Sequence, residues 1–455
     1  ASANIHRTAF RERAVCIATD RAALIQQLEA LSQAQQPPAS GVLRGLASRR
    51  PGKLAWMFTG QGSQSPGMAA DLLRDHPVFR EAFDQVSGLL DPHLNRTLRS
   101  LICAEPEEEA EAAALLANTG YTQPALFAIG YALSQLWLSW GVQPDLLIGH
   151  SIGEVVAAHL AGVFSLEDAC RLVIARSRLM QALPENGGMA AVLCPAERLS
   201  AWLVDHPEVA IAAYNGPANT VISGPLNALE QVIRRAEAAG LDVRPLKVSH
   251  AFHSPQMAPM LADFEQALRQ IRFSPPTRIL ISNLSGDVAG AEIATPDYWC
   301  EHVINPVRFQ QGIQTVQAQG AQVFIEMGAR PTLIGMARQC LDDLGLCFLP
   351  SLLPGQSDWK SISTALGQLF IFGNPVSWQG FHAAFQYRRV SLPGYPFEKQ
   401  TFWWSQGADQ PGTTLWVDYI GVGGVQPGPT GQTIGDAALQ PQAPASHQLD
   451  LVDLP

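Results

Sequence analysis

The stretch Gly149-His150-Ser151-Ile152-Gly153-Glu154 predicts the fold of this chain more directly than any other. Before it, residues 145–149 form a short apolar run suited to a buried strand, and after it residues 155–160 are small and apolar enough to open a buried helix. A serine between two glycines, in a turn that joins a strand to a helix, lies near free N–H groups that stabilise negative charge. We therefore interpret Ser151 as a nucleophile; the alternative is a serine that only caps a helix.

Composition limits the kinds of protein that this chain can be. Its 455 residues are 47% apolar with a net charge of −10, which predicts a globular protein of one large or two to three smaller domains and disfavours nucleic acid as a partner. Seven cysteines without C-x-x-C spacing predict free thiols, no zinc site and a reducing, cytoplasmic compartment. No stretch resembles a targeting leader or reaches the ~20 apolar residues of a membrane span, so we expect no membrane contact. The chain begins with Ala1 rather than Met, which suggests a piece of a longer protein.

Apolar runs and helical patterns alternate along most of the chain, which predicts an α/β fold. We expect a strand at 14–18 and a helix from Asp20, then a linker over 35–50 that contains Pro37-Pro38. A long helix is expected from about Thr122, with Pro124 in its first turn, and another from a cap at Ser165 to about Leu183. Further strands at 53–58, 278–283 and 323–327 complete a main sheet around the strand that precedes Ser151.

Residues 189–248 alternate as strand, helix, strand, strand, helix and strand, which is the βαββαβ order of ferredoxin-like units. This unit is inserted after the helices that follow Ser151, so His250 and His253 emerge at the junction of two subdomains, where active sites are common. Towards the end, residues 391–404 are extended and aromatic, which suits a strap on a surface. Residues 405–455 contain no Lys or Arg and are rich in Pro, Gly and Gln, which predicts a flexible linker.

A serine nucleophile needs a base, and histidine has a suitable pKa. Of eleven histidines we favour His253, although an isolated histidine is more often a surface or core residue. A metal site at His250 and His253 is not expected, because no carboxylate or cysteine stands beside them at ligand spacing. The loop that begins at Gly60 is a weak match to a phosphate-binding loop; its backbone could instead donate to an oxyanion. Arg176 could bind a carboxylate with two parallel hydrogen bonds or be a solvated helix residue.

Five motifs, in this order, resemble the acyltransferase domains of modular polyketide synthases, relatives of malonyl-CoA:acyl carrier protein transacylases. They are Gly60-Gln61-Gly62-Ser63-Gln64, the Ser151 motif, Arg176 in Ala175-Arg176-Ser177-Arg178, Tyr214-Asn215-Gly216-Pro217, and His250-Ala251-Phe252-His253-Ser254. The resemblance extends over residues 1–404. It implies a hydrolase-like large subdomain with a parallel central sheet (51–186 and 250–385) and an inserted ferredoxin-like small subdomain (187–249). It also implies a partial ketosynthase-to-acyltransferase linker (1–50), a post-acyltransferase linker (386–404) and an interdomain linker (405–455).

The resemblance also implies roles for single residues. Ser151 is the acylated nucleophile and His253 its base, in a dyad whose histidine is oriented by a backbone carbonyl. Gln61 and Ile152 donate backbone N–H groups to the oxyanion, and Arg176 binds the acyl carboxylate. Asn215 and His150 line the substrate pocket. No metal and no permanently bound cofactor are implied.

Phe252, Ile152 and the run Thr119–Phe127 resemble the malonyl-selective members of that family. The resemblance thus implies transfer of malonyl from malonyl-CoA, through a seryl ester, to the phosphopantetheine thiol of an acyl carrier protein beside a ketosynthase and other synthase domains. The alternatives are a methylmalonyl-selective or relaxed acyltransferase, a plain serine hydrolase, and a scaffold module that has lost catalysis.

Overall fold

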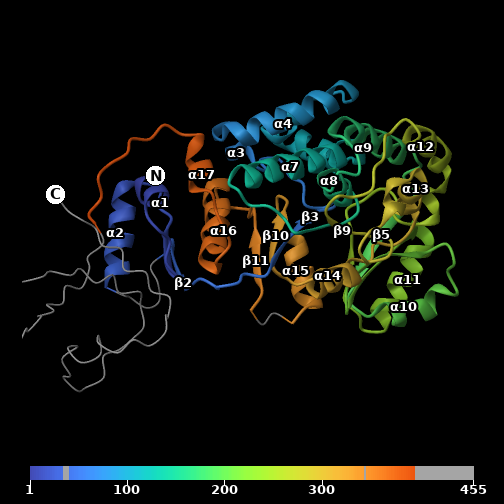
Figure 1. Ribbon diagram of the computed structural model, residues 1–455. Coiled ribbons are helices and arrows are strands. Elements are labelled where there is room, and N and C mark those ends of the chain that lie inside the picture. The colour runs from blue at the N-terminus through green and yellow to red at the C-terminus, as the bar shows by residue number, and fades with distance from the viewer. Residues whose placement is uncertain (34–39, 343–344, 395–455) are drawn as a thin grey trace, which may run out of the picture. The chain divides into compact units, whose positions relative to one another are not determined.

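Five parallel strands in the order β11-β10-β3-β4-β9 form the central sheet of the computed structural model (Figure 1), which describes residues 1–33, 40–342 and 345–394. The sheets and helices of the fold, apart from Ser2, lie in the unit formed by Ala1 and Ala3–Arg388. The strands are β3 (Lys53–Phe58), β4 (Leu146–Gly149), β9 (Ile279–Ile281), β10 (Ala321–Met327) and β11 (Cys347–Pro350). Parallel sheets are buried on both faces, which agrees with the nearly continuous burial of β3, β4 and β10.

Alternate residues of these strands enter two separate cores. Trp56 and Phe58 of β3 join Leu147 of β4 in one core, whereas Ala55 and Met57 lie in the other. This division follows from the two-residue period of a strand. Layers of helices therefore cover the sheet on both faces.

Helices α7, α8 and α9 cover one face, and α14 and α15 cover the other (Figure 1). Asn118 caps α7 through its side chain, and Ser165 caps α9 in the same way. The helices of the unit, in chain order, are α1 (Ser2–His6), α2 (Arg21–Ser32), α3 (Ala70–Asp75), α4 (Pro77–Leu90), α5 (Leu98–Ile102), α6 (Glu109–Ala117), α7 (Thr119–Ser139), α8 (Gly153–Leu160), α9 (Leu166–Gln181), α10 (Ala196–Leu203), α11 (Leu226–Ala238), α12 (Leu261–Leu268), α13 (Pro296–Ile304), α14 (Phe309–Ala318), α15 (Thr332–Cys340), α16 (Asp358–Phe372) and α17 (Trp378–Ala383).

A second, antiparallel sheet has the order β6-β7-β5-β8 and is covered by α10 and α11. Its strands are β5 (Gly187–Val192), β6 (Ala210–Gly216), β7 (Asn219–Pro225) and β8 (Val243–Pro245). This order and the βαββαβ sequence of elements are those of a ferredoxin-like unit, so the predicted fold class is confirmed. A single parallel bridge between Ala213 and Val307 connects this sheet to the chain that enters α14.

The expectation that residues 35–50 form only a linker was wrong for its second half. Residues Val42–Leu46 form strand β2, which pairs antiparallel with β1 (Glu12–Cys16). Five residues beside Pro37-Pro38 and Gly41 were too short a run to be distinguished from a turn. The two strands pack on α16, where a side chain at Gly367 would meet Val15 and Leu43 at 3.0 and 3.1 Å.

Several helices and strands also begin or end at other residues than the sequence predicts. Helix α7 begins three residues before Thr122, because the side chain of Asn118 caps it, and Pro124 therefore lies in its second turn. Strand β8 ends at Pro245 rather than at residue 248, and strand β11 was not predicted at all. Residues 395–404 of the expected strap and the expected linker 405–455 lie outside the described residues. No helix in the described part of the chain is both long and apolar enough to span a membrane.

Glu326, at the end of β10, is a buried carboxyl that caps a helix from outside it. Its two oxygens accept hydrogen bonds from the N–H groups of Leu333 and Ile334, both 2.8 Å long, in the first turn of α15. The side chain is 1% exposed, and burial raises its pKa to about 8. Glu326 therefore joins the sheet to α15 through backbone groups that have no intrahelical partner.

We expect Glu326→Gln to lower the free energy of unfolding by about 1–3 kcal/mol, because an amide nitrogen placed against an N–H group leaves a buried donor unpaired. Chemical denaturation measures this change. Unchanged stability would show that the capping bonds contribute nothing. Glu326 is not among the candidate site residues, so we expect the variant to keep the wild-type activity per folded chain.

Candidate active site

Ser151 lies in a tight turn between the end of β4 and the start of α8. Its φ is +52°, in the left-handed region that side chains rarely adopt, at a typical cost of about 1–3 kcal/mol. The glycines beside it are required by close approach: a Cβ at Gly149 would lie 2.1 Å from the Glu154 nitrogen, and one at Gly153 would lie 2.1 Å from the Phe58 carbonyl oxygen. The turn therefore presents Ser151 in one strained conformation at the carboxyl edge of the sheet.

His253, in the segment between β8 and Pro255, lies against Ser151. Its Nε2 lies 2.8 Å from Ser151 Oγ, and its Nδ1 lies 2.9 Å from the carbonyl oxygen of Asn305. A carbonyl can only accept, so Nδ1 carries the hydrogen and Nε2 of the neutral ring is free to take a proton from the serine. His253 also has a left-handed backbone, with φ +55°. Of the three non-glycine residues with positive φ in the described chain, two are thus this serine and this histidine.

Arg176 of α9 is the cation next to the serine. Its Nη2 donates to Ser151 Oγ at 3.2 Å, and its Nη1 donates to Gln123 Oε1 of α7 at 2.7 Å. The side chain is buried, and its Nε meets no acceptor among the described residues. No carboxylate of the described chain forms an ion pair with it. Burial lowers the pKa of Arg176 to about 9, which leaves the guanidinium charged at neutral pH.

Two backbone N–H groups near the serine turn have no acceptor within the described chain. One is that of Ile152, before α8, and the other is that of Gln61, which follows Gly60 in the loop after β3, where a Cβ at Gly60 would lie 2.7 Å from the His150 carbonyl oxygen. The N–H of Ser151 itself is occupied, because it donates to Asn283 Oδ1 at 2.8 Å. Unpaired N–H groups of this kind are what an oxyanion requires.

Burial controls the charge of the base. Burial, then the nearby His302 and Arg176, hold the pKa of His253 well below its ordinary value, although the bond to Asn305 opposes this shift. Burial likewise lowers the pKa of His150 and, with Arg176 as the next cause, that of His302. His253 is therefore a neutral ring at pH 7 and can accept a proton.

The other residues singled out from the sequence lie around this centre. His150 Nε2 lies 2.8 Å from Asn215 Oδ1, so these two side chains bind each other and connect the two sheets. Phe252 is buried, with its ring centroid 5.9 Å from that of His250. His250 Nε2 lies 2.9 Å from the carbonyl oxygen of Leu183. The described chain contains no cluster of three or more potential metal ligands.

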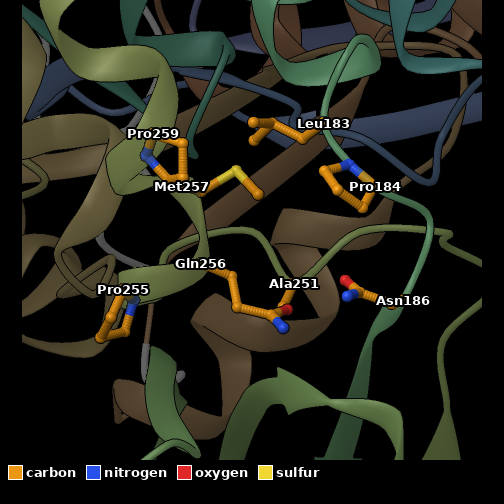
Figure 2. Close-up of a pocket in the computed structure, with 8 residues that line it drawn as sticks. All are labelled: Leu183, Pro184, Asn186, Ala251, Pro255, Gln256, Met257 and Pro259. Atoms are coloured by element: carbon orange, nitrogen blue, oxygen red, sulfur yellow. The ribbon is translucent and has the colours of Figure 1, made fainter.

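A cavity of about 230 Å³ lies beside the segment that carries His253 (Figure 2). Its lining residues come from the connection between α9 and β5 and from the segment around His253, and they are Leu183, Pro184, Asn186, Ala251, Pro255, Gln256, Met257 and Pro259. Leu183 and Met257 contribute apolar surface, and Asn186 and Gln256 contribute carboxamides. Neither Ser151 nor Arg176 is among its lining residues, so the cavity is distinct from the serine centre.

Sequence reasoning missed Gln123, Asn283 and the carbonyl of Asn305, all of which touch the central residues. Asn283 stands two residues after β9, at the carboxyl edge of the sheet, and the rule that ligands bind at this edge would have indicated it. Gln123 lies within the run Thr119–Phe127, which was considered only for substrate selectivity. A backbone carbonyl such as that of Asn305 leaves no signal in a sequence.

Residues 55–374 match the family model described as acyl transferase domain. The chain is 42% identical, over 92% of its length, to the spectinabilin polyketide synthase system protein NorB of Streptomyces orinoci, and 40% identical, over 87%, to polyketide synthase GfsA of Streptomyces halstedii. It spans only 19% and 5% of the length of these two relatives.

Solved structures agree with this assignment. The acyltransferase domain from the second module of the salinomycin polyketide synthase is 40% identical, with a TM-score of 0.77 over 84% of this chain and 88% of that one. Malonyl-CoA:acyl carrier protein transacylase of Xanthomonas oryzae pv. oryzae is 31% identical, with a TM-score of 0.62 over 70% of this chain and 98% of that one. The chain thus belongs to the acyl transferase domain family, as an acyltransferase of the kind found in modular polyketide synthases.

Proposed function

We propose that this acyltransferase takes a malonyl group from malonyl-CoA onto Ser151 and passes it to the phosphopantetheine thiol of an acyl carrier protein. The observation that carries the proposal is the buried guanidinium of Arg176, 3.2 Å from the serine oxygen and without a carboxylate partner in the described chain. Burying a guanidinium without a counter-ion costs free energy, unless the substrate supplies that counter-ion. The free carboxylate of a malonyl group meets that need.

The dyad geometry supports the following reaction. Ser151 Oγ attacks the thioester carbonyl while His253 Nε2 takes its proton, and the N–H groups of Gln61 and Ile152 stabilise the oxyanion. As the C–S bond breaks, the sulfur of coenzyme A leaves with the proton from His253. The second half reverses these steps with the pantetheine thiol as nucleophile, which regenerates Ser151. Coenzyme A and phosphopantetheine are thus parts of the substrates, and no bound cofactor is needed.

A plain serine hydrolase is the alternative enzyme. Such an enzyme would have no use for a buried guanidinium at the nucleophile, and here His253 is oriented by a carbonyl rather than by an acid. Both features favour acyl transfer. A scaffold that has lost catalysis is disfavoured because Ser151 and His253 keep hydrogen-bonding distance.

Malonyl rather than methylmalonyl is our choice of extender unit, because Phe252 is buried directly before His253 and Ile152 directly follows the serine. We propose that the Phe252 ring occupies the volume that a branching methyl would need. We retain His150 and Asn215 as proposed pocket residues, although each already has the other as a partner.

The proposed domain limits are a linker at 1–50, the acyltransferase at 51–385 with its small subdomain at 187–249, a second linker at 386–404, and an interdomain linker at 405–455. Strands β5 and β8, at Gly187 and Pro245, support the small-subdomain limits. We further propose a cytoplasmic setting, with an acyl carrier protein and a neighbouring ketosynthase as partners. These assignments concern the longer synthase of which similar chains are parts.

We expect kcat/KM for acylation to stay near its plateau at pH 6.5 and to fall only at lower pH. The neutral ring of His253 is the reactive form, and its pKa is held well below the ordinary value, so the proton that blocks catalysis binds only in more acidic solution. Stopped-flow release of coenzyme A measures the profile, with Ser151→Ala as the blank. A half-maximal rate at pH 6.5 or above would contradict this account of the base.

We expect Arg176→Ala to reduce malonyl loading by a factor of about a hundred or more, because stranding one partner of a buried charge pair costs roughly 3–5 kcal/mol. Acetyl loading should hold steady or rise, since acetyl has no carboxylate to lose. Arg176→Lys should recover malonyl loading only in part, because lysine restores the charge but not the two parallel bonds. Loading rates with the two thioesters measure these effects; an equal loss for both would make Arg176 structural.

We expect Phe252→Ala to raise the ratio of methylmalonyl to malonyl loading by about tenfold or more, since apolar discrimination of one methyl is worth roughly 1–3 kcal/mol. Competition between the two thioesters, read by intact mass, measures the ratio. The control is Phe164→Ala, which also removes a buried phenylalanine but, as a core residue outside the proposed site, should leave the ratio unchanged. An unchanged ratio in Phe252→Ala would remove this residue from the selectivity account.

A further inference from the structure

Behind the serine turn lies a group of buried polar side chains that the proposed reaction does not use. Its members are Glu154, Asn283, Tyr298 and His302, with exposed fractions of 0%, 3%, 5% and 1%. None of them touches Ser151 Oγ or the guanidinium of Arg176. Burying a carboxyl and an amide at this depth is costly, so their contacts call for an explanation.

We propose that Asn283, itself held by Glu154, is a positioning residue that fixes Ser151 in its left-handed conformation. The inference rests on the proposed function, because it concerns the rate at which Ser151 is acylated.

Asn283 binds the backbone at two points just before the Ser151 Cα, one on each side of His150. Its Oδ1 accepts the N–H of Ser151 at 2.8 Å, and its Nδ2 donates to the carbonyl oxygen of Gly149 at 2.8 Å. The two bonds need one acceptor and one donor on the same planar group, which an amide supplies. The two bonds fix the peptide that precedes Ser151, and on the other side of its Cα the Ser151 carbonyl accepts the Glu154 N–H at 2.9 Å. With the groups before and after the Cα both bound, φ of Ser151 cannot relax without breaking a bond.

Glu154 holds Asn283 in place through the main chain. Each of its oxygens lies 3.2 Å from the Asn283 N–H, and Tyr298 donates its hydroxyl to Oε1 at 2.5 Å. His302 Nε2 lies 3.0 Å from Oε2 without the alignment of a hydrogen bond. Glu154 is three residues after Ser151 at the start of α8, so one turn of helix connects the nucleophile to the residue that orients its clamp.

The Asn283 side chain also determines which backbone N–H groups are free to donate to the oxyanion. Asn283 occupies the N–H of Ser151, whereas the N–H of Ile152 meets no acceptor in the described chain. Loss of the clamp would let the serine oxygen leave His253 Nε2 and would move the Ile152 N–H from its place. Both changes slow acylation without altering the carboxylate-binding guanidinium.

The test compares Glu154→Gln, Asn283→Ala and the double variant with Glu326→Gln as a matched control. Glu326 is also fully buried and also accepts backbone N–H bonds with both oxygens, but it lies at the end of β10 and holds α15 instead of the serine turn. The burst of coenzyme A released from malonyl-CoA gives two readouts. Its amplitude counts folded, competent sites, and its rate reports how well each site is positioned.

We expect burst rates to fall roughly tenfold in Glu154→Gln and up to about a hundredfold in Asn283→Ala, the scale of loss when a reacting group is misplaced by about 1 Å. The amplitude per folded chain, KM and the malonyl preference over acetyl should stay as in wild type. Because Glu154 acts through Asn283, the double variant should be no slower than Asn283→Ala. Glu326→Gln should lose stability but keep the wild-type burst rate.

Asn283→Asp keeps the acceptor for Ser151 and loses the donor to Gly149, so its burst rate should lie between those of wild type and Asn283→Ala. This variant also replaces Asn283→Ala if Asn283→Ala does not fold.

Three results would overturn the inference: wild-type burst rates in Glu154→Gln and Asn283→Ala, multiplicative losses in the double variant, or an equal slowing in Glu326→Gln. The absence of any burst in the wild-type chain would instead refute the proposed function. The two failures are therefore distinguishable in one experiment.

Discussion

The hydrogen bond between Ser151 Oγ and His253 Nε2 joins residues 102 positions apart, and most of the fold is arranged around it. Each partner has a strained backbone, and each is held by a group outside its own segment: Asn283 for the serine and the Asn305 carbonyl for the histidine. The backbone preferences of a serine and a histidine alone would favour negative φ values in both turns. The bond therefore exists only because the parallel sheet, the inserted antiparallel sheet and α13 are packed in fixed positions, and strain at a site of this kind is stabilised by the surrounding structure.

The second constraint on the site is charge. The guanidinium of Arg176 is buried beside three histidines whose pKa values burial lowers, and its own neighbours at hydrogen-bonding distance are the neutral Gln123 and Ser151. Glu154, whose pKa burial raises to about 8, acts on it only from beyond ion-pair distance. The centre therefore carries an excess positive charge in a medium of low polarity. A substrate with a free carboxylate relieves this imbalance, whereas a neutral acyl group does not.

The sequence predicted those features that follow from local pattern. Apolar runs indicated β3, β4 and β10, the βαββαβ order indicated the small sheet, and the Ser151 motif indicated a strand-to-helix turn. Features that depend on distant contacts could not be predicted. Strand β2 is defined by its pairing with β1, and Asn305 binds His253 through its carbonyl. The position of Asn283 after a strand indicates the edge of the sheet, but its contact with Ser151 depends on the pairing of β4 with β9. The roles proposed for Gln61, Ile152 and Arg176 come from the resemblance to a family, because spacing alone left them open.

We propose that a buried guanidinium without an ion-pair partner makes the serine of this acyltransferase select an acyl group with a free carboxylate. Its most direct test is intact-mass analysis of the wild-type chain after a brief incubation with equal concentrations of acetyl-, malonyl- and methylmalonyl-CoA, followed by peptide mapping of the adduct. We expect one malonyl ester per chain, located on Ser151, with little acetyl or methylmalonyl. A predominant acetyl adduct, or acylation at another residue, would contradict it.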